Sequence, residues 1–232
     1  MLSSQSAGKS YAYILGVYLG DGCVTKYCVS KPLTFKVNTI DTDFADKISK
    51  ELSSLCNTII HRSQQTDKRW SKNSVLYQVG CPDQELCLKL RKDTNSKSVI
   101  PKYVSGWGNE LIKEFVVGLM DSEGYVKGRK TINIENGSTQ LTNRMFNMGF
   151  KSCDTWFFDF MKIVNLLGLK TGKVTVDKPY KDGYKTPQCF SIKMQSWVDS
   201  GMRFNIDRKN RRVDEWNSSP AYAHRITYPK RA

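Results

Sequence analysis

Two carboxylates stand at matching places in the sequence, each at the end of an apolar run. Asp21 is followed by Gly22, and Glu123 is followed by Gly124. If each run is a helix, each carboxylate meets the negative end of a helix dipole, and a second acid beside it adds repulsion. A divalent cation such as Mg²⁺, which binds carboxylate oxygens, would remove both penalties. Two acids, a metal ion and a polyanionic substrate together predict metal-assisted hydrolysis of a phosphodiester bond.

Small residues on one face of each apolar run predict that the two runs pack against each other. Gly16 and Gly20 are four residues apart in the first run. Gly118 and Ser122 repeat that spacing in the second run, and residues four apart share one face of a helix. Glycine inside a helix costs about 1 kcal/mol relative to alanine, and close approach of two helix backbones would compensate for that cost. We therefore expect two helices that cross at their glycines about a pseudo-twofold axis, with the two acids side by side.

The segments that follow the two acids repeat the same order of elements. Hydrophobic periodicity predicts an α+β protein with a duplicated αββαββα unit. In the first unit we expect strands at 23–29, 33–38, 58–63 and 75–79, and further helices at 44–55 and 83–90. In the second unit we expect strands at 125–134, 144–150, 173–176 and 188–193, and further helices at 157–167 and 195–202. Asp41 is the expected N-cap of the helix that follows it.

The repeat divides the chain into two halves. Residues 1–94 form the N-terminal half, 95–110 a linker rich in Ser, Gly and Lys, and 111–232 the C-terminal half. The second half has a longer first hairpin, and the residues after Met202 form a basic tail that includes Arg208 and Arg212.

The charge of the chain favours a polyanionic partner. Lys and Arg number 36 against 22 Asp and Glu, which gives a net charge of +14 and an isoelectric point of about 9.4. This excess favours nucleic acid over a small-molecule substrate. Hydrophobic residues make up 39% of the chain, enough for a packed core. The mean hydropathy is −0.48, no run approaches the roughly 18 apolar residues of a membrane-spanning helix, and residues 1–9 lack the apolar core of a signal peptide.

The cysteines and histidines argue against a zinc finger and against a disulfide framework. The chain has 7 cysteines and 2 histidines, and no Cys-x-x-Cys pair. We therefore expect reduced, half-buried thiols in an intracellular protein. Organellar, archaeal cytoplasmic and nuclear locations all stay open.

The two acidic motifs resemble the signature of a known family. Residues 14–22 and 116–124 are similar to the two motifs of the single-chain LAGLIDADG homing endonucleases, and the Ser-Val-Ile-Pro segment at 98–101 is typical of monomeric members. The resemblance spans residues 10–202 and implies a monomer with two four-stranded antiparallel sheets that form a saddle on double-stranded DNA. It also implies a site-specific endonuclease that uses Mg²⁺, with Mn²⁺ or Ca²⁺ as substitutes for binding. Staggered cuts at a long asymmetric target and an intron-encoded origin are implied as well.

The resemblance assigns roles to individual residues. Asp21 and Glu123 match the catalytic acids that bind metal, and the backbone carbonyls of Gly20 and Ser122 match the oxygen atoms that assist them. Lys193, at the end of the last strand, matches the active-site lysine.

The first half departs from the family pattern at two places. Leu19 stands where many members have an acid, as Asp121 does in the second motif, and that acid is expected to be structural. The place in the first half that corresponds to Lys193 carries no charge, so Gln78 is the candidate to contribute there.

Strand alternation separates the expected core from the expected DNA-binding face. Phe35 and Val37 should point into the core, which leaves Lys36 and Asn38 facing DNA. The other residues expected to face DNA from the strands are Thr25, Tyr27, His61, Ser63, Gln78, Lys127, Arg129, Thr131, Asn133, Arg144, Lys173 and Thr175. The loop residues expected to contact phosphates are Lys68, Arg69, Lys72, Lys178, Lys181 and Lys185.

Two other functions could use the same scaffold. An RNA-binding maturase that assists splicing of a host intron would need the basic surface but neither the two acids nor Lys193. A DNA-binding regulator with decayed catalysis would not need them either. Because both acids are present, we expect cleavage.

Overall fold

The computed structural model describes residues 4–26, 28, 30–66, 75–127, 131–133, 139–141, 147–176 and 186–218. The first half contains α1 (Ser4–Leu19), β1 (Cys23–Thr25), β2 (Thr34–Thr39), α2 (Thr42–Leu55), β3 (His61–Thr66), β4 (Val75–Cys81) and α3 (Gln84–Asp93). A short 3₁₀ helix, η1 (Lys102–Gly106), comes next. The second half contains α4 (Asn109–Ser122), β5 (Gly124–Lys127), β6 (Thr131–Asn133), β7 (Thr139–Leu141), β8 (Asn147–Ser152), α5 (Phe157–Leu166), β9 (Thr175–Val176), β10 (Gln188–Ile192), α6 (Met194–Asp199) and α7 (Asp207–Asn217).

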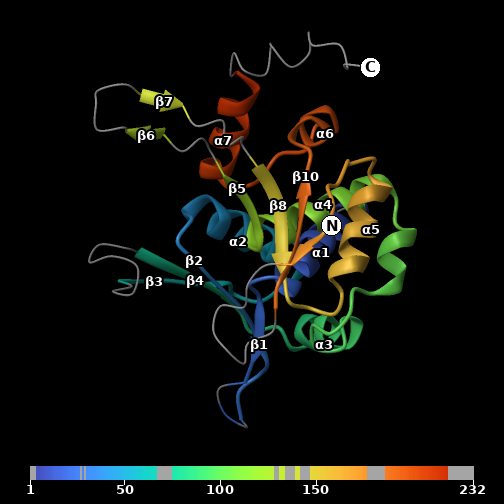
Figure 1. Cartoon of the computed structure of the whole chain (residues 1–232). Helices are drawn as coiled ribbons and strands as arrows, with labels where there is room; N and C mark the ends of the chain where they lie inside the picture. Colours follow the sequence, from blue (N-terminus) through green and yellow to red (C-terminus); the bar gives the residue numbers. More distant parts are fainter. Residues whose placement is uncertain are drawn as a thin grey trace.

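The strands form one four-stranded antiparallel sheet in each half (Figure 1). The strand order is β1-β2-β4-β3 in the first half and β5-β8-β10-β9 in the second, so equivalent strands hold equivalent places. The longer hairpin expected in the second half is divided, because β5 pairs with β8 while β6 and β7 form a ribbon of their own. The predicted α+β class and duplicated αββαββα unit are confirmed. None of the described helices is long and apolar enough to cross a membrane.

Helices α1 and α4 pack together at the centre of the molecule (Figure 1). A Cβ atom at Gly16 would lie 2.3 Å from the carbonyl oxygen of Phe115 and 2.8 Å from the backbone nitrogen of Leu119. A Cβ atom at Gly118 would lie 2.3 Å from the carbonyl oxygen of Tyr13. The two backbones therefore touch where the glycines permit it, and the predicted crossing is confirmed.

Each sheet buries one face under helices and leaves the other face polar. In the first sheet Phe35 and Val37 are fully buried while Asn38 is exposed, as strand alternation predicts. In the second sheet Phe150 lies under α5, with its ring centroid 4.6 Å from that of Phe160. The buried faces of both sheets belong to one hydrophobic core with α1 and α4.

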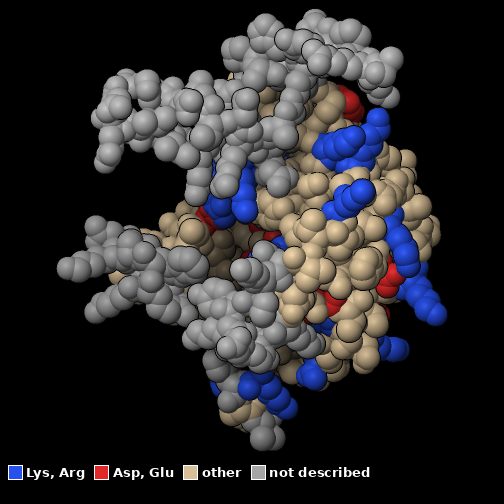
Figure 2. Space-filling view, viewed as in Figure 1, with Lys and Arg blue, Asp and Glu red and all other residues tan. Residues whose placement is uncertain are grey.

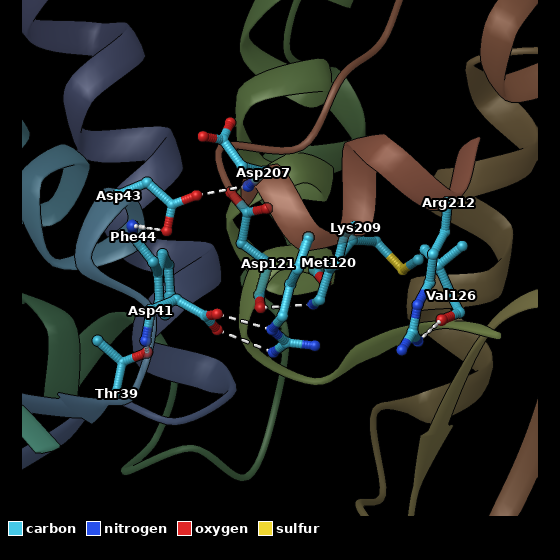
Figure 3. A network of polar contacts seen from close by, with 11 residues as sticks. Thr39, Asp41, Asp43, Phe44, Met120, Asp121, Val126, Asp207, Lys209 and Arg212 are labelled. Atoms are coloured by element: carbon cyan, nitrogen blue, oxygen red, sulfur yellow. Dashed lines mark hydrogen bonds and ion pairs between the residues drawn. The ribbon is translucent and has the colours of Figure 1, made fainter. Parts of the chain in front are cut away.

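Helix α7 joins the two halves, where a basic tail was expected (Figure 3). The guanidinium of Arg208 donates to both carboxylate oxygens of Asp41, at 2.6 and 2.8 Å, and Arg212 donates to the carbonyl of Val126. Asp41 does stand at the N-cap position of α2, but its side chain makes no capping hydrogen bond there. Asp41 is thus the N-cap residue of α2, as predicted, and its carboxylate pairs with Arg208.

Candidate active site

The C-terminal ends of α1 and α4 meet and bring the two motif acids together. A Cβ atom at Gly20 would lie 2.3 Å from Oγ of Ser122 and 3.1 Å from Cγ of Glu123. The negative charge of Asp21 raises the pKa of Glu123, so the two carboxylates are close enough to repel each other. Sequence positions far apart in the chain thus share one helix junction.

Asp21 and Glu123 are exposed at the surface, and partial desolvation still raises the pKa of both carboxyl groups. Burial is the largest influence on the pKa of Asp21 and raises it, while Lys209 and Lys97 lower it. The pKa of Glu123 is raised to about 6, first by burial and then by the charge of Asp21. Two ionised acids in this setting destabilise each other, and a bound cation would relieve that repulsion.

The donor atoms at the junction suit a hard divalent cation. Two carboxylates and the carbonyl of Gly20 offer oxygen, which Mg²⁺ takes in preference to nitrogen or sulfur. Within the described part of the chain, no group of three or more His, Cys, Asp or Glu side chains could hold a metal ion. The site therefore fits an ion that binds one or two carboxylates together with substrate phosphate, and not an all-protein cage.

A lysine from the expected linker donates hydrogen bonds to the carbonyls at the C-terminal end of α1. The ammonium of Lys97 donates to the carbonyl oxygen of Gly20 and, at 3.2 Å, to that of Gly22. Burial lowers the pKa of Lys97, whereas nearby acids, Asp154 and then Glu123, raise it. Lys97 thus places a positive charge on the carbonyls that the dipole of α1 makes negative.

A second lysine, from α7, closes the end of α4 (Figure 3). The ammonium of Lys209 donates to the carbonyl oxygens of Met120 at 2.7 Å and Asp121 at 2.6 Å. Its side chain is 3% exposed, and burial lowers its pKa to about 8. At the C-terminal end of each motif helix, backbone carbonyls therefore accept hydrogen bonds from a lysine that lies elsewhere in the chain.

Asp121 is held inside the protein. Its carboxylate accepts hydrogen bonds from the hydroxyl of Tyr13 at 3.0 Å and from Asn205, through the backbone at 3.1 Å and the side chain at 2.9 Å. Burial raises its pKa to about 6, and the charge of Lys209 lowers it. These contacts agree with the structural role that the resemblance implies for this acid. Leu19, its counterpart in the first motif, is buried among apolar side chains.

The strand register does not bring Lys193 to the acid pair. Gly124 lies in one row with Phe190 across β8. Lys193 is three residues beyond Phe190 and past the end of β10, roughly 10 Å from that row at the usual rise of a strand. It is exposed and lies at the start of α6.

Lys97 and Lys209 are the basic residues whose charges act on both acids, and sequence reasoning missed them. Lys97 directly precedes the 98–101 segment that carries part of the family resemblance, which is a weak signal for its importance. Lys209 lies in a basic run in which nothing distinguishes it from its neighbours.

Polar residues cross the open face of the first sheet in rows. Lys36 and His61 lie in one row, and Asn38, Gln78 and Ser63 lie in the next. The side-chain amide of Gln78 donates to Asn38 at 3.0 Å. A hollow of about 470 Å³ opens on this face, lined among others by Lys36, His61, Ser63 and Gln78. The predicted parity is confirmed in that these residues share the face opposite to Phe35 and Val37.

The second sheet presents a similar face. Lys127, Lys151 and Thr175 are exposed on one side of the sheet, and Lys173 and, in the first half, Thr25 are exposed as well. In the space-filling view the molecule is hollowed between the ends of the two halves, where acidic and basic side chains lie together (Figure 2). Nine expected DNA contacts lie outside the described residues, namely Tyr27, Lys68, Arg69, Lys72, Arg129, Arg144, Lys178, Lys181 and Lys185, as do the side chains of Thr131 and Asn133.

Solved structures with this fold include LAGLIDADG homing endonucleases. I-DmoI, bound to its target DNA in the presence of Mn, is 13% identical with a TM-score of 0.55, and the match covers 84% of this chain and 96% of that one. I-WcaI, bound to its DNA recognition sequence, is 10% identical with a TM-score of 0.55, over 89% of this chain and 86% of that one. The N-terminal LAGLIDADG domain of DUF199/WhiA is 9% identical with a TM-score of 0.51, over 95% of this chain and 88% of that one. No protein-family model and no curated protein matches the sequence.

The fold is therefore the LAGLIDADG fold, in the two-motif arrangement of the single-chain homing endonucleases. At these identities the likeness is one of fold. The activity has to be argued from the residues at the helix junction.

Proposed function

We propose that this protein is a metal-dependent, site-specific endonuclease that cuts double-stranded DNA. The observation that carries the proposal is the junction of α1 and α4, where Asp21 and Glu123 meet beside the carbonyl of Gly20. Two partly desolvated carboxylates that repel each other do not stabilise a fold. A protein that only bound nucleic acid would be more stable with either acid replaced by its amide. Their presence together is explained by a reaction that needs them.

In this proposal Asp21, Glu123 and the backbone carbonyls of Gly20 and Ser122 hold Mg²⁺ or Mn²⁺. When bound, the ion would neutralise charge on a phosphate and make a water molecule a better nucleophile. The two acids keep the binding oxygens together. Helices α1 and α4 hold those oxygens at fixed places, because the glycine contacts leave the helices no room to slide.

The open faces of the two sheets bind the DNA on either side of the junction. Their polar residues differ between the halves, so the proposed target is long and asymmetric, and one chain is enough to bind it. The proposed cuts fall on both strands and are staggered, as the resemblance to the single-chain homing endonucleases implies. An intron-encoded origin remains part of the proposal and predicts that the DNA flanking the intron, once joined, is the target.

Cleavage of a defined duplex tests the proposal. The substrates are a plasmid with the joined flanks of the reading frame and a duplex selected from a random pool by binding to the protein in Ca²⁺. We expect wild-type protein to linearise them in Mg²⁺ or Mn²⁺ but not in EDTA. Asp21→Asn and Glu123→Gln should bind without cutting, and Asp159→Asn, which alters an exposed acid on α5, should cut as wild type does. Tight binding by wild type with no cleavage in either metal would overturn the nuclease and leave a binding protein.

A further inference from the structure

The segment between α3 and η1 is held in an uncommon backbone conformation. Asn95, Ser96 and Lys97 have φ angles of 46°, 53° and 74°, three consecutive non-glycine residues in the left-handed region. Such residues are rare and persist where the surrounding structure enforces them, often at functional sites. The conformation therefore calls for contacts that hold the segment in place.

Those contacts fix Lys97 from both halves of the protein. The backbone N–H of Lys97 donates to Oγ1 of Thr94 at 3.0 Å. Its carbonyl accepts from Nε1 of Trp156, also at 3.0 Å. Thr94 is 0% exposed and Trp156 is 1% exposed, so both anchors are rigid parts of the core. The backbone of Lys97 is thus fixed before its side chain meets any ligand.

The side chain of Lys97 binds an oxygen atom that is also a proposed ligand of the metal ion. Its ammonium donates to the carbonyl of Gly20 and lies 5.8 Å from the ring centroid of Tyr18. Its charge acts on both Asp21 and Glu123. An ammonium and a divalent cation repel each other, so they cannot both bind the carbonyl of Gly20.

Lys209 provides the internal comparison. It closes α4 in the same way, but its acceptors are Met120 and Asp121, which precede the proposed metal-binding carbonyl of Ser122. Lys209 is also buried in the core, whereas Lys97 is only half-buried and therefore partly accessible to solvent. Of the two lysines, Lys97 is the one that a metal ion has to displace.

We propose that Lys97 is a positioning residue that holds the Gly20 carbonyl and the two acids in the metal-free protein, and that leaves this carbonyl when a divalent ion binds. This inference rests on the proposed function. Because Lys97 competes with the ion, the DNA-free protein binds metal weakly. Phosphates of bound DNA add the negative charge that draws Lys97 away, so metal and DNA load together.

Binding of Mn²⁺ to the full-length, DNA-free protein tests the inference, followed by electron paramagnetic resonance. We expect Lys97→Met to tighten Mn²⁺ binding by about tenfold or more, since one positive charge beside two acids is removed. Lys97→Arg, which keeps the charge, should bind Mn²⁺ as wild type does. Lys92→Met, at an exposed lysine on α3, is the matched control and should change nothing. Adding Asp21→Asn to Lys97→Met should abolish the gain.

Circular dichroism establishes that each variant is folded. Should Lys97→Met fail to fold, Lys97→Gln removes the charge while keeping an N–H donor, and the same gain is expected. If a folded, uncharged variant binds Mn²⁺ no more tightly than wild type while wild type cuts DNA, this inference fails and the nuclease stands. If the gain appears and depends on Asp21 while no protein cuts DNA, the nuclease fails and the competition between Lys97 and metal stands.

Discussion

At the scale of single residues, the two motif acids oppose the stability of the fold that carries them. Asp21 and Glu123 both have raised pKa values, with burial as the first cause, and the charge of Asp21 raises the pKa of Glu123 further. The charges of Lys97 and Lys209 lower the pKa of Glu123 but do not bring it back to its ordinary value. The metal-free protein should therefore be more stable when either acid is neutral.

The loss of folding stability that Glu123 causes depends on pH and can be measured. Its pKa is about 6 in the folded protein and near the ordinary value of about 4.3 in the unfolded chain. The folded state thus binds the proton more tightly, so this residue destabilises the protein above pH 6 and the loss is regained as pH falls toward 4.3. In EDTA, Glu123→Gln should melt at a higher temperature than wild type at pH 7.5, and the gap should narrow by pH 5. A gap that stays constant over this range would contradict the raised pKa.

At the scale of elements, the crossing of α1 and α4 depends on two glycines, Gly16 and Gly118. In a solvated helix, Gly16→Ala would stabilise by up to about 1 kcal/mol. Here the new Cβ would lie 2.3 Å from the carbonyl oxygen of Phe115, so the helices have to separate. We expect a loss of roughly 3 kcal/mol in urea unfolding, as for other overpacked cores.

Gly106→Ala is the matched control for that substitution, because a Cβ atom there meets nothing within 4 Å. It should leave the free energy of unfolding within about 0.5 kcal/mol of wild type. Equal stability for both variants would mean that the two helices are not in backbone contact in solution.

Helix α7 makes a second prediction at this scale, through its buried lysine. Lys209→Met leaves two carbonyls of α4 without their donor and removes the cation that opposes the buried charge of Asp121. Removing one partner of a buried charge pair costs about 3 kcal/mol or more. Arg211→Met changes an exposed residue of the same helix and should have almost no effect on urea unfolding. A Lys209→Met protein as stable as wild type would show that α7 does not dock as described.

At the scale of the whole molecule, the net charge of +14 should govern DNA binding in the proposed function. Each phosphate contact releases counterions, so we expect affinity to fall roughly 10³-fold or more between 50 and 200 mM salt. Lys36, on the open face of the first sheet, should contribute to this slope, and Lys36→Met should lower it by about 0.9. Lys162→Met, on the outer side of α5, should leave the slope unchanged. Fluorescence anisotropy across a salt series measures both, and identical slopes for the two variants would remove the open face from the interface.

The sequence predicted those parts of the molecule that depend on local periodicity. Two local patterns were enough: the alternation of side chains in β2, and the four-residue spacing of Gly16 with Gly20 and of Gly118 with Ser122. They predicted the duplicated unit and the close approach of the two acids. The pairing register of β10 depends on strands far apart in the chain. Parity alone did not reveal that Phe190, and not Lys193, is level with Gly124, the residue that follows Glu123.

The two lysines at the junction could not be predicted for a related reason. Lys97 reaches Gly20 only through three residues with positive φ, which no pattern of residue types at 95–97 indicates. Lys209 reaches Met120 only because α7 folds back across both halves, and the same packing pairs the carboxylate of the N-cap residue Asp41 with Arg208. Contacts between residues so distant in sequence leave no local trace.

The position of α7 also determines when a newly made molecule becomes complete. During synthesis on the ribosome, both motif helices and the strands of both sheets are translated before residues 207–217. Until then the end of α4 lacks Lys209, and the buried charge of Asp121 lacks the cation that opposes it. The contacts that complete the end of α4 therefore form only after α7 has been made and has docked on both halves.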